Sequence, residues 1–143
     1  MNPCKPEGDA GRRRLGNWGE KYAADYLNNL GYVIIERNIR TPYGEIDLVA
    51  RQEVESHPLS KGSGSHHPFV TVFVEVKTRS SANFGLPEAS ITNRKKEHML
   101  ASAQAYLQVH PELDGDWRVD VIAIQRYNSS SEPTITHFEN AIN

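Results

Sequence analysis

The chain has 143 residues, one cysteine and a formal net charge of −2. This length predicts a single domain that buries about 70% of the surface its unfolded form exposes, and the acidic net charge is an objection to nucleic-acid binding, which usually needs a basic surface. The lone Cys4 excludes an internal disulfide and suits a reducing cytoplasm, while the absence of an apolar signal core or a membrane-length apolar run argues against secretion and membrane insertion.

The N-terminal part of the sequence predicts a flexible tail followed by a helix. Residues 1–11 are rich in polar residues, Pro and Gly, and precede a single domain expected over residues 12–143. Apolar residues recur at helical spacing from Leu15 to Leu30, which predicts an amphipathic helix that ends at Gly31 as its cap. Glu20 lies at the edge of the apolar stripe, so its carboxylate can reach toward the end of a sheet.

Three strands are predicted next, over residues 32–37, 44–51 and 70–78. A short turn at 41–44 joins the first two, and the Gly- and Ser-rich residues 52–68 predict a mobile loop before the third.

The C-terminal part predicts a second helix over 93–109, a fourth strand over 117–125 and a short edge strand over 134–138. We therefore expect an α/β fold with a central mixed β-sheet flanked by helices, in the order α-β-β-β-α-β.

Two of the predicted strands carry charges inside runs that otherwise favour burial. Alternation places Glu75 and Lys77 on one face of the third strand, and Asp47 on the face of the second strand opposite to Ile46. If these strands pair, the Cβ atoms of Asp47 and Glu75 lie about 5 Å apart. Mg²⁺ is usually held by one or two carboxylates together with a substrate phosphate, so this pair can share one ion. Lys77 would then orient the attacking water or stabilise charge on the phosphate.

These residues stand in strings that resemble a known family. The strings are Gly16-x-x-Gly19-Glu20, Arg37-Asn38, Gly44-Glu45-Ile46-Asp47-Leu48, Val72-Phe73-Val74-Glu75-Val76-Lys77-Thr78-Arg79 and Arg118-Val119-Asp120-Val121. Over about residues 15–125 the chain is similar to the uncharacterised YraN-like bacterial family of the PD-(D/E)xK nuclease superfamily, whose members include restriction enzymes and Holliday-junction resolvases. Ile46 stands where the superfamily motif has proline.

The resemblance has several implications for the fold and the site. It implies a restriction endonuclease-like fold, a third carboxylate near the metal at Glu20 on the first helix, and a lysine at position 95 or 96 near the active site.

Basic residues are clustered even though the chain is acidic overall. The candidates for binding nucleic acid are Arg12, Arg13, Arg14, Arg79, Arg94, Lys95 and Lys96. The last three stand at a helix start, where positive charge opposes the helix dipole, which favours an anion nearby. The alternative for that run is an ordinary solvated helix turn.

Other charged or aromatic residues have a structural interpretation. A Glu-x-Lys pair alone usually marks the solvated face of a strand, and the combination with Asp47 and Glu20 is what favours a metal site. Glu45 is either a second ligand or, by preference, an exposed carboxylate at a strand end. The remaining interpretations are a solvated His66-His67 pair, a structural ion pair between Arg118 and Asp120, and core positions for Trp18 and Trp117.

The sequence therefore predicts a cytoplasmic endonuclease that hydrolyses phosphodiester bonds of nucleic acid, including branched recombination or repair intermediates, with Mg²⁺ or Mn²⁺. Asp47, Glu75 and Glu20 would be the metal ligands and Lys77 the catalytic cation. The expected partners are DNA and a second copy of the chain in a homodimer, without a membrane. Two alternatives remain open: a non-catalytic nucleic-acid-binding or assembly module with the same fold, and a metal-dependent phosphoesterase that acts on nucleotides.

Overall fold

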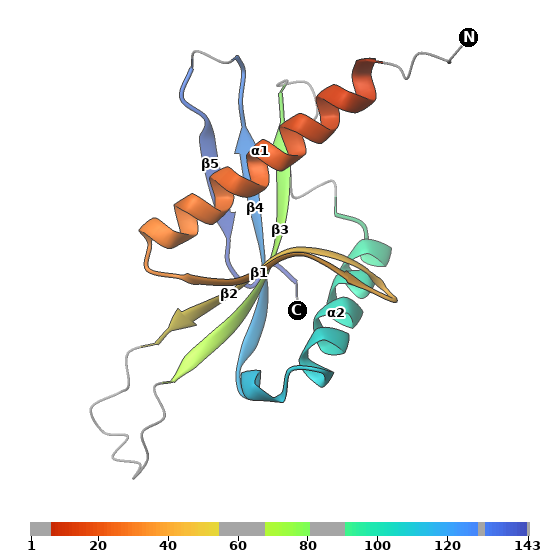
Figure 1. Cartoon of the computed structure of the whole chain (residues 1–143), viewed down its shortest axis with the longest axis vertical. Helices are drawn as coiled ribbons and strands as arrows, with labels where there is room; N and C mark the ends of the chain where they lie inside the picture. Colours follow the sequence, from red (N-terminus) through yellow and green to blue (C-terminus); the bar gives the residue numbers. More distant parts are fainter. Residues whose placement is uncertain (1–6, 55–67, 81–90, 129–130, 143) are drawn as a thin grey trace.

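The chain folds into a five-stranded mixed sheet with a long helix on either face (Figure 1). The computed structural model describes residues 7–54, 68–80, 91–128 and 131–142. The elements are α1 (Glu7–Asn29), β1 (Val33–Thr41), β2 (Gly44–Glu53), β3 (Phe69–Arg79), α2 (Asn93–Gln108), the short 3-10 helix η3 (Pro111–Leu113), β4 (Trp117–Gln125) and β5 (Thr134–Phe138). None of the helices in these ranges is both long and apolar enough to cross a membrane.

The strands lie in the order β1-β2-β3-β4-β5, with β3 and β4 parallel and the other neighbouring pairs antiparallel. This arrangement confirms the predicted α/β fold, a restriction endonuclease-like mixed sheet flanked by helices, and the short edge strand extends the order to α-β-β-β-α-β-β.

Two hydrophobic clusters lie on opposite faces of the sheet. Leu27 of α1 packs with Val72 and Val74 on one face, whereas Tyr106 of α2 packs with Phe73 on the other. The alternation predicted for β3 is therefore confirmed as far along the strand as the two apolar clusters extend. Continued to the charged residues, it places Glu75 and Lys77 on the α2 face.

Helix α1 begins at Glu7, within the segment expected to be a flexible tail. The first turns lack an apolar stripe, but acidic residues favour a helix N-terminus and the following arginines are good helix formers, so local propensity extends the helix. Residues 1–6 lie outside the described part of the chain. At the other end Gly31 has φ +94°, and the Tyr32 N–H donates to the Leu27 carbonyl at 3.0 Å, as expected for the predicted glycine cap.

Strand β2 separates from β3 at the end that carries the charged residues. The ladder between the two strands runs from Leu48 opposite Val74 to Glu53 opposite Phe69, while β2 remains paired with β1 as far as Gly44 opposite Thr41. The first residues of β2 therefore pair with β1 and diverge from β3. The divergence turns Ile46 into the cluster beneath α2, whereas Leu48 packs in the cluster beneath α1. Strict alternation would place these two residues on one face, so the alternation assumed for this strand is wrong at Ile46.

Sheet pairing also extends into both ends of the predicted 52–68 loop. Residues 55–67 of that loop lie outside the described residues, and its mobility stays a prediction.

Candidate active site

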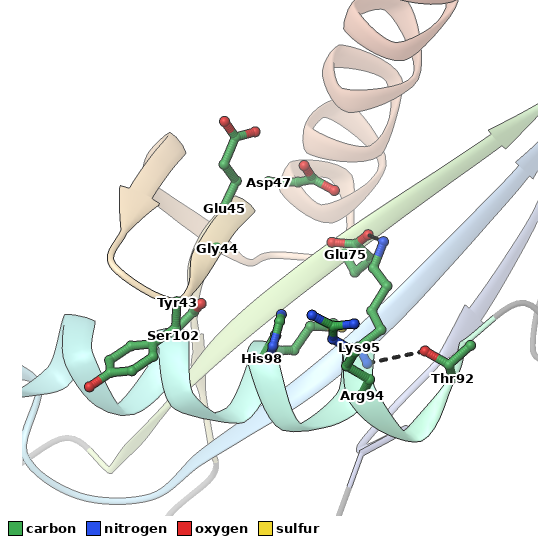
Figure 2. A pocket seen from close by; sticks show the side chains of 11 residues that line it. Tyr43, Gly44, Glu45, Asp47, Glu75, Thr92, Arg94, Lys95, His98 and Ser102 are labelled. Carbon is green, nitrogen blue, oxygen red and sulfur yellow. Dashed lines mark hydrogen bonds and ion pairs between the residues drawn. The ribbon is translucent and has the colours of Figure 1, made fainter.

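The separation of β2 from β3 opens a pocket of about 510 Å³ beside the first turns of α2. Its walls come from the tip of the β1–β2 hairpin, the ends of β2 and β3, and one side of α2 (Figure 2). Asp47 and Glu75 line it from the two strands, and Arg94, Lys95 and His98 line it from the helix. Carboxylates from neighbouring strands thus face basic side chains across one opening.

Asp47 is held by a backbone hydrogen bond that replaces strand pairing. The Val76 N–H of β3 donates to its Oδ2 at 2.8 Å, at the point where the β2–β3 ladder has ended. Burial and the nearby charge of Glu75 raise the pKa of Asp47 from 3.8 to about 7, although the Val76 hydrogen bond opposes the shift. The fold therefore holds the Asp47 carboxylate in a position where its ionisation costs free energy.

Glu20 reaches the same carboxylate from α1. Its pKa is raised by burial, while hydrogen bonds from Asn38 and Asp47 oppose that shift. A side chain on the preceding Gly19 would clash with the Thr78 hydroxyl of β3, so glycine is what allows α1 to approach the sheet closely enough for Glu20 to extend to Asp47.

Asn38 contributes a side chain that the sequence analysis did not assign to the site. It has φ +52° inside β1, between pairs Arg37–Leu48 and Ile39–Ile46, and so lies opposite Asp47. Asparagine tolerates this left-handed conformation better than most residues, and such conformations cluster at functional sites. Its hydrogen bond to Glu20 gives this irregularity a function in positioning the acid.

Two ammonium groups face one oxygen of Glu75. The Oε1 atom lies 2.8 Å from Lys95 Nζ and 3.5 Å from Lys77 Nζ. Burial and the neighbouring Lys95 lower the pKa of Lys77. Burial alone would lower the pKa of Lys95 as well, but its contact with Glu75 outweighs that and raises it. Of the two lysines indicated near the active site, Lys95 is the one at the pocket.

The basic run at the start of α2 is divided between two surfaces. Arg94 and Lys95 line the pocket described above, whereas Lys96 lines a second pocket with Val121 and Phe138. The anion expected beside this helix start is Glu75. Adjacent helical residues point about 100° apart around the axis, and the sequence does not show which of them faces the strand. Spacing alone therefore could not identify the basic side chain that contacts Glu75.

The other predicted residues are exposed, stand at a strand end or lie outside the described side chains. Arg79 is at the end of β3, where its carbonyl accepts the Arg126 N–H, and Arg13 and Arg14 are exposed on the N-terminal part of α1. Glu45 is an exposed strand residue paired with Arg40 at 3.5 Å. The Arg12 side chain and the His66-His67 pair lie outside what the structure describes.

The α2 side of the pocket includes two further residues that sequence analysis missed, His98 and Ser102. The hydroxyls of Thr41 and Ser102 are hydrogen-bonded at 3.0 Å, which ties the hairpin tip to α2. His98 lies one helical turn after Arg94 and on the same side of the helix. The spacing of four between Arg94, His98 and Ser102 is the sequence signal that could have identified this wall.

The donor set suits a hard divalent cation. Within the described ranges, no three His, Cys, Asp or Glu side chains are arranged to hold one metal ion. Mg²⁺, however, usually keeps several waters and takes only one or two carboxylates from the protein. Asp47 and Glu75 supply that number of oxygen donors, so their chemistry fits such an ion.

A second charged cluster lies on the opposite face of the sheet. Asp120 is fully buried, and its carboxylate contacts Arg118 Nε at 3.0 Å, His137 Nε2 at 2.8 Å and the Asn140 N–H at 2.8 Å. Arg118 also donates to Gln52 and Tyr32. The predicted structural ion pair is therefore confirmed, within a network larger than the sequence indicated.

The two tryptophans pack against the two hydrophobic clusters, as predicted. Trp18 stacks on Tyr22 beside the α1 cluster, with the Arg126 guanidinium 4.5 Å from its ring centre. Trp117 meets the ring of Phe73 edge-on beneath α2.

Comparison with known proteins identifies the family. The model of "Uncharacterised protein family UPF0102" matches residues 19–124. The chain belongs to this family. UPF0102 is the YraN family, so the resemblance seen in the sequence is confirmed. The matched segment contains the four acids Glu20, Asp47, Glu75 and Asp120 together with Lys77 and Lys95, and it excludes the arginines at 12–14.

Several UPF0102 relatives cover nearly the whole chain. The chain is 37% identical to a UPF0102 protein of Dehalococcoides mccartyi over 92% of its length and 94% of the relative. It is 40% identical to one from Syntrophomonas wolfei over 90% and 97% of the two lengths, and 39% identical to one from Geobacter sulfurreducens over 94% and 93%. The similarity therefore spans most of this chain and most of each relative.

Proposed function

We propose that the protein hydrolyses phosphodiester bonds of nucleic acid, with DNA as the preferred substrate, in the pocket between β2, β3 and α2. The cofactor would be Mg²⁺ or Mn²⁺. The observation that carries the proposal is that Asp47 and Glu75, from adjacent strands, line one pocket together with Lys95, while Lys77 lies 3.5 Å from Glu75. A buried pair of acids with basic neighbours is the donor set that a metal-assisted phosphoryl reaction requires.

Each side chain has a distinct role in this proposal. Asp47 and Glu75 would hold the ion, and Glu20 would assist from α1 through its contact with Asp47. The ion would lower the pKa of a bound water and offset negative charge on the phosphate. Lys77 would orient that water or stabilise the charge that develops on the phosphate, in a site partly shielded from solvent.

The site also answers the objection raised by the acidic net charge. Arg94 and Lys95 place two cations at the pocket, and Arg13 and Arg14 are exposed on α1. A local basic surface is sufficient for phosphate contacts, because screening limits each charge to about 8–10 Å at physiological salt.

The first test measures metal binding by calorimetry with Mn²⁺. Asp47→Asn and Glu75→Gln should each weaken Mn²⁺ binding strongly, because each removes one anionic ligand at nearly constant volume. Glu53→Gln is the matched control: it removes a carboxylate from the same strand, but this group is exposed at the other end of β2 and does not line the pocket. Equal affinity in the wild type and in both site variants would rule out the proposed centre.

The same proteins should then be assayed on linear, flapped and four-way DNA with Mg²⁺ or Mn²⁺. Cleavage by the wild type and by Glu53→Gln, but not by Asp47→Asn or Glu75→Gln, would support the nuclease. Tight DNA binding without cleavage of any substrate would instead favour a non-catalytic module.

A further inference from the structure

Lys95 forms an ion pair that the charge balance of Glu75 does not require. Lys77 stands two residues from Glu75 on the same face of β3 and already provides one positive charge, 3.5 Å from Oε1. Lys95 approaches the same oxygen from a different element and more closely, at 2.8 Å. The result is two ammonium groups on one carboxylate oxygen.

The position of Lys95 on α2 is unfavourable for a structural cation. It lies in the first turn, where its N–H donates to the Thr92 cap at 3.2 Å, and a positive charge there opposes the helix dipole. Its side chain is 39% exposed, against 22% for Lys77. A long flexible side chain at the open side of a pocket can leave Glu75 at little structural cost.

We propose that Lys95 is a phosphate-binding residue that rests on Glu75 as a counter-ion and moves to a substrate phosphate once a divalent metal takes its place. This inference rests on the proposed metal site at Asp47 and Glu75. A divalent ion beside Glu75 repels an ammonium group a few ångströms away, whereas a phosphate entering the pocket attracts it. The two states therefore exchange one partner of Lys95 for another, and its charge stays compensated in both.

The proposal predicts effects of opposite sign on two affinities. Lys95→Met removes the competing charge at nearly constant length, so it should bind Mn²⁺ about tenfold more tightly by calorimetry, as expected when one like charge leaves the edge of the site. The same variant should bind a fluorescent four-way DNA junction more weakly in Ca²⁺. The log-log salt dependence of that binding should become shallower by about one.

Two further variants serve as matched controls. Lys95→Arg keeps the charge and should retain Mn²⁺ affinity close to that of the wild type. Lys96→Met makes the same substitution one residue later on α2, where the side chain lines a different pocket, and should leave Mn²⁺ affinity unchanged.

The outcomes separate this inference from the proposed function. If the wild type binds Mn²⁺ and Lys95→Met binds it equally or less tightly, the counter-ion role is wrong while the metal site stands. If Lys95→Met gains Mn²⁺ affinity but keeps full DNA affinity and an unchanged salt slope, the phosphate-binding role is wrong. A wild type that does not bind Mn²⁺ removes the metal site itself, and the inference with it.

Discussion

Two charged clusters on opposite faces of one sheet, around Asp120 and around Asp47, differ in how the charge of the carboxylate is compensated. On the α1 face, the carboxylate of Asp120 has a guanidinium, an imidazole and a backbone N–H as partners. On the α2 face, Asp47 accepts one backbone N–H and has two further acids, Glu20 and Glu75, as neighbours. Both acids lie on strands of the same sheet, so the contrast comes from their partners.

The pKa values of the two groups show the consequence. Burial would raise the pKa of Asp120, but the hydrogen bonds from His137 and Arg118 outweigh it and lower the value. Burial raises the pKa of Asp47 to about 7, and the charge of Glu75 adds to the shift. A carboxylate buried for stability is surrounded by donors, whereas one whose charge remains uncompensated in the fold is a candidate for function.

The largest expected difference between the clusters is in stability. Asp120→Asn should lower the free energy of unfolding by about 3 kcal/mol or more, because it leaves the buried Arg118 and His137 without their anion. Asp47→Asn should leave stability unchanged or raise it, because it removes a repelled charge. Urea unfolding at pH 8 with a chelator measures both.

Asp25→Asn on the exposed side of α1 is the control for the substitution itself and should change stability by less than about 0.5 kcal/mol. If Asp120→Asn and Asp47→Asn destabilised the protein equally, the contrast between a structural and a functional acid would fail.

The sequence predicted the strand-borne part of the site because a strand has a fixed period of two. Glu75 and Lys77 had to share a face. Asp47 comes one residue beyond the end of the β2–β3 ladder at Leu48 and Val74, so the sequence indicated the neighbouring strand correctly although the two strands no longer pair there. The parts contributed by other elements depend on packing that no local pattern encodes. Glu20 meets Asp47 because Gly19 permits a close approach to Thr78.

Backbone irregularities limited the prediction in the same way. The left-handed Asn38 and the divergence of β2 that turns Ile46 toward α2 both break the alternation on which the strand analysis relied. Such departures come from the separation of two strands, which is a tertiary feature.

The next contrast is between the cations of the two clusters. Lys77→Ala should reduce cleavage by about 10² or more at saturating Mn²⁺, as loss of one preorganised electrostatic contact typically does. Mn²⁺ affinity should not fall, since an ammonium group is not a metal ligand, and the fold should persist because the side chain is partly exposed. Arg118→Met should instead reduce stability and spare the site, because Arg118 contacts Asp120, Gln52 and Tyr32. Loss of Mn²⁺ binding in Lys77→Ala would show that this lysine organises the acids and does not act on the substrate.

The smallest expected effect is the slope of stability with pH in the absence of metal, at most about 1.4 kcal/mol per pH unit for a single group. Asp47 has a pKa of about 7 in the folded chain and 3.8 as its ordinary value, so between these values the folded state retains a proton that the unfolded state loses. Its contribution to the free energy of unfolding is therefore complete below about pH 4, falls as pH rises toward 7, and is level above that. Asp120, with its lowered pKa, acts in the opposite sense and loses its contribution only as pH falls below about 4.

Subtracting the profile of Asp47→Asn from that of the wild type isolates the decline between pH 4 and 7. Excess Mn²⁺ should offset that decline, because a cation stabilises the ionised carboxylate. A difference profile that is flat across this window would mean that Asp47 carries its charge in the fold without cost, and the comparison between the two clusters would have to be abandoned.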